Sequence, residues 1–437
     1  MRRVNGHETG GQVHILSFEG PDAYSRAGGI ASRVTGLANA LADAGCDTHL
    51  WYIGDARRPG HERLGRLTLH RWCQWISACH PGGVYDGEEG KHADYASSLP
   101  PFLLRETLLP HLERPRGRVA ILAEEWQTVH AVLHLDWLLR RAGVRDRVAL
   151  QWNANNTFGF ERIDWPRLAE AATITTVSRY MRHEMSRLGV DALVIPNGLP
   201  ADAFRRPNRG SVREFRQRLA GRLVLSKVAR WDPDKRWLLA VETIARLKQD
   251  GAQPLLVARG GMEAHGREVL ERAAALGLRI GERVVPEAGA PGLLASISDP
   301  DACDIMVLGA PLDREACQLL FEASAAVLAN SGREPFGLVG LEAMAAGGVA
   351  CVGATGEDYA VAGWNALVLQ TQDPREFVRE FGRLRARRGA DTALRRHALA
   401  TAPRYAWPEV VAHVLHPRLT AESNGGTDLR RPGRSVA

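Results

Sequence analysis

The chain has 437 residues, of which 45% are hydrophobic and 24% are charged, as in an ordinary globular protein rather than a disordered or membrane protein. This length exceeds the size at which a single hydrophobic core keeps growing, so two domains of roughly 200 residues each are expected. The net charge of +6 is modest and is carried almost wholly by arginine. Without a dense basic stripe and interleaved aromatic residues, nucleic-acid binding is not expected.

Signals for membranes, export and metals are also missing from the sequence. No run approaches the roughly 20 apolar residues that span a bilayer. The first residues, "MRRVNGHETGGQ", lack the apolar core of a secretory signal, so a cytoplasmic protein is expected. The six cysteines form no CxxC pair, which argues against a zinc site or a disulfide framework. Cys73, Cys79 and His80 match no common metal-ligand spacing.

The first half of the chain alternates between strand and helix patterns. Residues 13–20, 30–45 and 47–54 read as strand, amphipathic helix and strand, a unit that implies a parallel sheet. Further strands are expected at 118–125, 148–153, 173–178 and 192–198, with helices at 165–172 and 178–189 between them. We therefore expect an N-terminal Rossmann-like domain over residues 1–198.

A stretch rich in proline, glycine and asparagine, residues 196–211, marks a linker, after which the alternation starts afresh. The predicted fold class is α/β, with a second doubly wound domain over 199–403 that faces the first across a cleft. Since ligands bind at the carboxyl ends of parallel strands, the loops expected around the cleft are 17–30, 124–130, 153–160, 230–236 and 331–338. Residues 421–437 are expected to be a disordered tail.

The segment "EPFGLVGLEAMAAGG" (334–348) places Glu342 inside an otherwise apolar run. A buried carboxylate needs a partner, because an unpaired buried charge costs several kcal/mol. The amides of Phe336, Gly337 and Leu338 stand where a helix begins, and such an end favours phosphate. Glu334 and Glu342 could then bracket one ligand and accept hydrogen bonds from its hydroxyls. Alternatively, Glu342 faces solvent and Glu334 is a loop charge.

Two further clusters suit a diphosphate. Gly28 and Gly29 precede a helix after the first strand, so the backbone can approach a ligand closely, although a plain turn explains them as well. Arg230 and Lys235 in "VARWDPDKRW" combine a planar fork and a point charge, which suits two neighbouring phosphates. They could equally be solvated charges. Asp232 and Asp234 in the same segment are spaced like a metal-binding DxD, but we favour a helix cap.

The expected acceptor side lies in the first domain. Asn153 and Asn155 follow a strand in "QWNANNTFGF", where amides suit sugar hydroxyls but also loop turns. Glu124 and Glu125, at the end of another strand, are acid or base candidates.

In this order, the motifs resemble glycosyltransferase family 4, the retaining nucleotide-sugar glycosyltransferases of GT-B fold. The resemblance runs from about 13 to 420. It rests on the E-x7-E of Glu334 and Glu342, the "AGG" after the first strand, "TTVSRYMRHEM" leading to "VIPNGL", and Arg230 with Lys235. A family histidine of the first-domain loop is absent from "WNANNTFGF", and residues 404–420 resemble the helix that crosses back to the first domain.

The resemblance implies a role for each group. Glu334 would contact hydroxyls of the donor sugar and Glu342 those of the nucleotide ribose, while Arg230, Lys235 and Gly29 would neutralise the diphosphate. The implied reaction transfers a sugar, expected to be a hexose, from a nucleoside diphosphate sugar to an acceptor hydroxyl with retention, without a cofactor or metal. A nucleotide-sugar epimerase of the same fold and a non-catalytic sugar-binding protein are the alternatives. The base, sugar and acceptor cannot be read from these residues.

Overall fold

The computed structural model describes residues 11–114, 117–297 and 303–415. The chain divides into two compact units: unit 1 comprises residues 1–198 and 407–437, and unit 2 comprises residues 199–406. The division after Gly198 coincides with the expected domain boundary. The chain returns to unit 1 at Trp407, three residues later than the expected crossing helix begins. The predicted tail, 421–437, lies outside the described residues.

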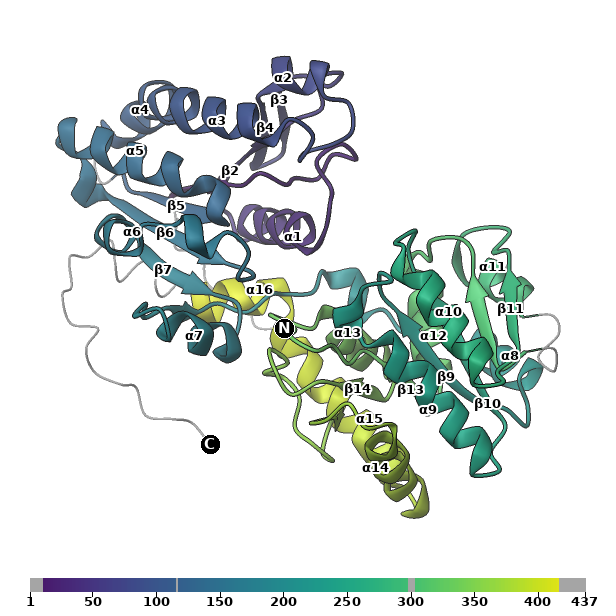
Figure 1. The fold of residues 1–437 in the computed structure, drawn as a ribbon. Helices are drawn as coiled ribbons and strands as arrows, with labels where there is room; N and C mark the ends of the chain where they lie inside the picture. The colour runs from purple at the N-terminus through teal and green to yellow at the C-terminus, as the bar shows by residue number, and fades with distance from the viewer. Residues whose placement is uncertain (1–10, 115–116, 298–302, 416–437) are drawn as a thin grey trace. The chain divides into compact units, whose positions relative to one another are not determined.

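Unit 1 is built on an eight-stranded sheet of order β3-β4-β2-β1-β5-β6-β7-β8 (Figure 1). Its neighbouring strands are parallel except for the antiparallel pair β3 and β4. The strands are β1 Gln12–Leu16, β2 Asp47–Ile53, β3 His61–Leu64, β4 Leu67–Trp72, β5 Val119–Glu124, β6 Val148–Ala154, β7 Thr173–Thr176 and β8 Leu193–Val194. The predicted strands are present, although β8 is shorter than expected.

Helices cover both faces of this sheet. They are α1 Gly29–Asp43, α2 Gln74–Cys79, α3 Glu88–Leu103, α4 Leu109–Leu112, α5 Val129–Arg141, α6 Trp165–Ala171, α7 Arg179–Ser186 and α16 Trp407–Val410. α3 packs against α5, whereas α1 packs against α16 (Figure 1). The α1 side holds a core of buried residues from β1, β2, β5 and α1, closed by Trp407, Val410 and Val411. A residue such as Trp407, 2% exposed, gains about 1.5–3 kcal/mol from burial.

Unit 2 has a seven-stranded parallel sheet of order β11-β12-β10-β9-β13-β14-β15. Its strands are β9 Leu223–Val228, β10 Pro254–Arg259, β11 Ile280–Arg283, β12 Ile305–Leu308, β13 Ala326–Leu328, β14 Ala350–Val352 and β15 Leu367–Val368. The helices are α8 Arg209–Arg218, α9 Trp237–Gln249, α10 His265–Ala275, α11 Gly289–Ser296, α12 Arg314–Ala323, α13 Leu338–Ala346, α14 Pro374–Ala386 and α15 Ala390–Thr401.

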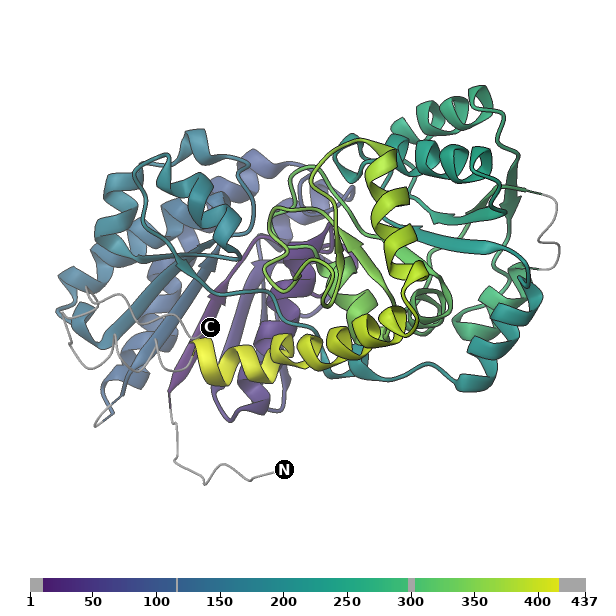
Figure 2. The ribbon, with the colours of Figure 1, turned by 90° about the horizontal axis from the view of Figure 1, so that it is seen from below.

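Two cores lie on the two faces of the unit 2 sheet. One is formed with α9, α10, α14 and α15 and includes the fully buried Trp237. The other is formed with α8, α11 and α12. Figure 2 shows α14 and α15 in the yellow-green and yellow end of the colour range. The predicted fold class, two doubly wound parallel α/β units, is therefore confirmed.

The structure also contains elements that the sequence analysis left unassigned between residues 55 and 117, where β3, β4 and α3 form. β3 is short and largely exposed. α3 carries Pro100 and Pro101 within it, and proline normally ends a helical pattern. All six cysteines are free, and the described residues contain no group of three or more His, Cys, Asp or Glu side chains that could hold a metal ion.

Candidate functional site

The segment that joins β13 to α13 carries the first predicted glutamate. Glu334 Oε2 accepts from Lys235 Nζ at 2.6 Å and from Ser331 Oγ at 2.8 Å. The side chains of Lys235 and Glu334 are 24% and 16% exposed. Two predicted site residues, 99 positions apart in the sequence, therefore form a partly buried ion pair. Glu334 is thus more than a solvated loop charge.

The start of α13 is held by aromatic packing. Phe336 is buried against the rings of Tyr359 and Tyr405, with centroids 5.9 Å and 6.1 Å away. Tyr359 Oη donates to the carbonyl of Gly337, and a Cβ at Gly337 would lie 2.8 Å from Glu357 Cγ. Gly337 is the N-cap, and no side chain caps this helix end. The amide of Leu338 donates to the carbonyl of Phe336 at 3.0 Å, so the capacity of this helix end to bind an anion rests on the amides that follow it.

The remaining residues of "VARWDPDKRW" play two roles. Arg230 is largely exposed, with Nη2 3.8 Å from Asp232 Oδ2. Asp232 caps a 3₁₀ turn, accepting from the amide of Asp234 at 2.9 Å, while Asp234 Oδ1 accepts from the amide of Arg333 at 2.9 Å. Asp232 therefore has the expected cap geometry, whereas Asp234 bonds the backbone of the segment that carries Glu334.

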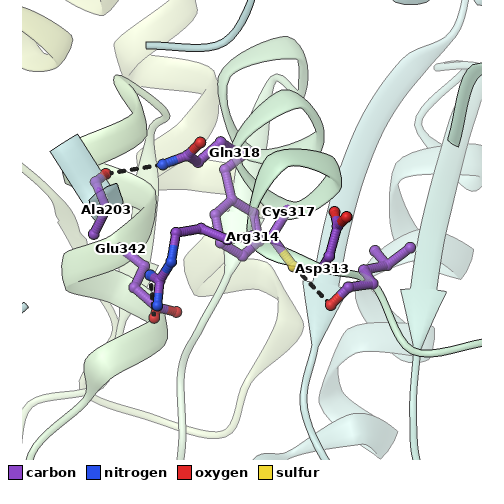
Figure 3. A pocket seen from close by; sticks show the side chains of 8 residues that line it. Ala203, Asp313, Arg314, Cys317, Gln318 and Glu342 are labelled. Atoms are coloured by element: carbon purple, nitrogen blue, oxygen red, sulfur yellow. Dashed lines mark hydrogen bonds and ion pairs between the residues drawn. The ribbon is translucent and has the colours of Figure 1, made fainter. Parts of the chain in front are cut away.

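Glu342 lies on α13 beside a pocket of about 190 Å³. Its Oε1 is 3.8 Å from Nη1 of Arg314, and its side chain is 35% exposed. Figure 3 shows Arg314 and Glu342 directed toward each other, with Ala203, Cys317 and Gln318 also lining the pocket. Burial raises the pKa of Glu342, the Arg314 charge opposes this, and Asp202 adds to it. Glu342 is therefore neither fully buried nor fully exposed to solvent, and it lines a pocket that could hold a ligand.

Two buried titratable groups beneath this segment were missed by sequence reasoning. Glu357 accepts from the amides of Gly353 and Thr355 at 3.3 Å and 3.1 Å, and burial, followed by the charge of Glu334, raises its pKa to about 7. Lys227 donates to the carbonyls of Leu328 and Asn330 at 2.9 Å and 3.4 Å.

Burial lowers the pKa of Lys227 to about 7. Its contacts fix the end of β13, from which the Glu334 segment departs. A lysine within an apolar strand, in a chain with only four lysines, was the available sequence signal for this residue.

In unit 1, Glu124 and Asn153 are part of a closed polar network. Glu124 is 1% exposed and is bonded to Arg33 Nε at 3.1 Å. It also accepts from the side-chain amides of Asn153 and Asn155 at 2.9 Å and 2.8 Å, and Asn153 accepts from Thr175 Oγ1 at 2.9 Å. These contacts satisfy Glu124 and Asn153 inside the unit. The expectation that they face an acceptor is therefore corrected to a structural role.

Glu125 differs from its neighbour. Its backbone has φ = 70°, a strained conformation for a residue with a side chain. Its Oε1 accepts from the amide of Asn155 at 2.6 Å. Burial raises its pKa to about 8, the hydrogen bonds from Asn155 oppose this shift, and the charges of Glu124 and Glu19 add to it. Glu125 is therefore a candidate proton-carrying group near neutral pH.

The glycine pair before α1 is already engaged on one side. The amide of Gly28 donates to Glu19 Oε2 at 2.9 Å, so the chain's own carboxylate occupies this amide, contrary to the expectation that Gly28 binds the donor. Neither Gly28 nor Gly29 has a positive φ, and a Cβ on either would meet nothing within 4 Å. The protein itself therefore does not require glycine at Gly29, which leaves a ligand contact open there.

Comparison with known proteins bears on the family. Residues 27–203 match the family described as Glycosyltransferase Family 4. The predicted family is confirmed. The match spans most of unit 1, whereas Arg230, Lys235, Glu334 and Glu342 lie beyond it. No curated protein matches the sequence.

Solved structures similar to this chain cover almost its whole length. Sucrose-phosphate synthase from Thermosynechococcus elongatus has a TM-score of 0.65 and 17% identity over 94% of this chain and 99% of that one. The catalytic domain of starch synthase IV from Arabidopsis thaliana, bound to ADP and acarbose, has a TM-score of 0.66 and 14% identity over 94% and 99%.

A third similar structure is an α,α-trehalose-phosphate synthase from Burkholderia xenovorans in complex with glucose-6-phosphate. Its TM-score is 0.60, with 16% identity over 95% and 100% of the two chains. These likenesses establish the GT-B fold, and the match of residues 27–203 to family 4 supports a glycosyltransferase. None of the described helices is long and apolar enough to cross a membrane.

Proposed function

We propose that this family 4 glycosyltransferase transfers a hexosyl group from a nucleoside diphosphate sugar to an acceptor hydroxyl, with retention at the anomeric carbon and without a metal ion. The observation that carries the proposal is the ion pair of Lys235 and Glu334 in the segment that leads to the start of α13, which has no side-chain cap, with Glu342 in the second turn of that helix. This set combines a cation, two carboxylates and orphan amides, which suits a ligand with both phosphates and hydroxyls.

The main catalytic contribution would be stabilisation of the leaving diphosphate. Charge develops on that group as the glycosidic bond breaks, and preorganised donors act most strongly where charge develops. Lys235 is held by Glu334 at 2.6 Å, which fixes the ammonium group without a ligand, and the exposed Arg230 supplies a planar guanidinium group from the same loop. A front-face path, in which the leaving phosphate takes the acceptor proton, accounts for retention without a protein nucleophile.

The carboxylates would orient the donor. We assign Glu342 to the ribose hydroxyls and Glu334 to the hydroxyls of the transferred sugar. Uridine is the first base to test, since a similar fold, HepE of Anabaena, is described in complex with UDP and glucose, at 14% identity. Similar folds hold ligands with and without a phosphate, glucose-6-phosphate and acarbose. The proposal includes the cytoplasmic location expected from the sequence.

A donor panel tests the proposal. UDP-, ADP- and GDP-sugars are incubated with mixed sugar and sugar-phosphate acceptors, products are identified by mass spectrometry, and the anomeric configuration is read by NMR. We expect one donor to be consumed only when an acceptor is present, with retention in the product. Conversion of the donor to an isomer without acceptor would establish an epimerase instead. Binding of donors without any turnover would leave a sugar-binding protein.

A further inference from the structure

We propose that a cavity of unit 2, at the amino ends of β9 and β13, binds a small phosphate ester at a second site, away from the segment that carries Glu334. The cavity measures about 350 Å³ and is lined by residues of α8 and α15 and by residues that precede the two strands. β9 and β13 are parallel neighbours, and Lys235 and Glu334 follow their carboxyl ends. The cavity therefore lies at the opposite edge of the sheet from that ion pair.

The lining of this cavity is rich in positive charge. Three arginines and one aspartate line it: Arg216 on α8, Arg222 before β9, and Asp391 and Arg395 on α15. Among the described lining residues these four are the charged ones, so the positive charges exceed the negative by two. Asp391 accepts from Arg395 Nε at 3.1 Å, so its charge is already engaged. Guanidinium groups in such excess favour an anion, and phosphate above all.

Backbone carbonyls hold two of these arginines in position. Arg216 Nη2 donates to the carbonyl of Glu322 at 2.8 Å, while Arg395 donates from Nη1 to Gly347 at 2.9 Å and from Nη2 to Ser324 at 3.0 Å. Carbonyl oxygens orient a guanidinium group but carry no full charge to neutralise it. Within the described part of the chain, Nη1 of Arg216 donates to no group, which leaves it available to a ligand.

The positive charges also act on one another. Burial lowers the pKa of Arg216, the charge of Arg395 lowers it further, and the charges of Glu322 and Asp391 oppose this shift. Glu322 is itself paired with Arg206, at 2.6 Å. Two guanidinium groups that line one cavity thus repel each other. An anion bound in the cavity would attract both, and this attraction would offset their repulsion.

The size and the remaining wall of the cavity indicate what the anion carries. The wall between the arginines is largely apolar and includes Leu219, Ala220 and Ala323. The volume of about 350 Å³ falls within the range of about 300–1,000 Å³ that is usual for small-molecule sites, which is more room than a single phosphate ion needs. The ligand class is therefore a phosphate ester, with its phosphate on the arginines and its organic part against the apolar wall.

Calorimetric titration tests the inference, with glucose 1-phosphate as the probe and with glucose and inorganic phosphate as comparison ligands. Two variants alter the cavity. Arg216→Gln removes the guanidinium group that has a free nitrogen, and Ala220→Glu adds a carboxylate to the wall at an exposed position and leaves every arginine in place. Arg213→Gln is the matched control, because Arg213 is exposed on the same helix and does not line the cavity.

We expect the wild type to bind glucose 1-phosphate more tightly than either comparison ligand. Arg216→Gln and Ala220→Glu should each weaken that binding by at least about tenfold, whereas Arg213→Gln should leave it unchanged. Should Arg216→Gln fail to fold, Ala220→Glu decides the matter. The inference is overturned if the wild type does not bind the probe, if inorganic phosphate binds as tightly, or if both cavity variants retain wild-type affinity. Binding is measured without turnover, so the result is independent of the proposed transfer reaction.

Discussion

Glu342→Gln separates a ligand contact from a structural charge. In the structure Glu342 faces Arg314 at 3.8 Å, with both side chains more than a third exposed, and such a pair contributes about 0–1 kcal/mol to stability. Burial also raises the pKa of Glu342, so a neutral amide should be tolerated. The loss of stability should therefore stay below about 1 kcal/mol. A carboxylate hydrogen-bonded to a hydroxyl, in contrast, contributes about 1.5–3 kcal/mol, or about 10- to 150-fold in affinity.

Glu334→Gln should behave differently. Glu334 holds Lys235 at 2.6 Å, so the substitution frees the ammonium group while removing a contact to the transferred sugar. We expect turnover to fall about 10- to 150-fold with the affinity for free nucleoside diphosphate kept, whereas Glu342→Gln should weaken that affinity.

Calorimetric titration with UDP, a turnover assay and thermal melting are run on both variants and on Glu315→Gln, an exposed control on α12. Parent-like binding and turnover in both variants would refute the assignment of the site.

Three further predictions use other parts of the chain. Gly29→Ala should leave the melting temperature unchanged or raise it, because a Cβ there meets nothing within 4 Å and alanine is favoured in a helix. Turnover should nevertheless fall if the backbone at Gly29 approaches the diphosphate, and parent-like turnover would exclude that contact. Chelation with EDTA should leave activity intact, and loss of turnover restored by magnesium or manganese would contradict the metal-free mechanism. Burial, with the charges of His49 and His61, lowers the pKa of His70 to about 2. The contribution of neutral His70 to the free energy of unfolding should therefore be complete above about pH 6.5 and should fall by up to about 1.4 kcal/mol per pH unit below it. Urea unfolding should show a shallower pH dependence of stability in His70→Phe than in the exposed control His183→Gln, and equal slopes would reject this.

The alternation of strands and helices was readable because parallel strands are buried on both faces. Such strands appear as short continuous apolar runs, as β10 does in "PLLVAR", where five of the six residues are buried. The segment 55–117 gave no such pattern. β3 is polar and exposed, and the prolines within α3 interrupt its helical signal.

The candidate site could be predicted in part from the sequence, because the buried strands beside it were recognisable. The positions of Lys235 and Glu334 after strands predicted that both lie at a carboxyl edge. Their mutual contact depends on β13 lying next to β9, with Ala326 opposite Leu225, which no local pattern reveals. Glu124 shows the converse. Its place at a strand end suggested chemistry, but its contact with Arg33, 91 positions away, places it in an internal network.

The two units share a plan and differ in how the first amides of one helix are satisfied. In unit 2, Gly337 is the N-cap of α13, and no side chain caps this helix. The segment that leads to α13 carries Glu334, which forms an ion pair with Lys235. In unit 1, Glu19 bonds the amides at the start of α1, and Tyr85 holds it there. Orphan amides and a cation favour phosphate at the start of α13. We therefore propose that the main phosphate contacts of the donor lie in unit 2.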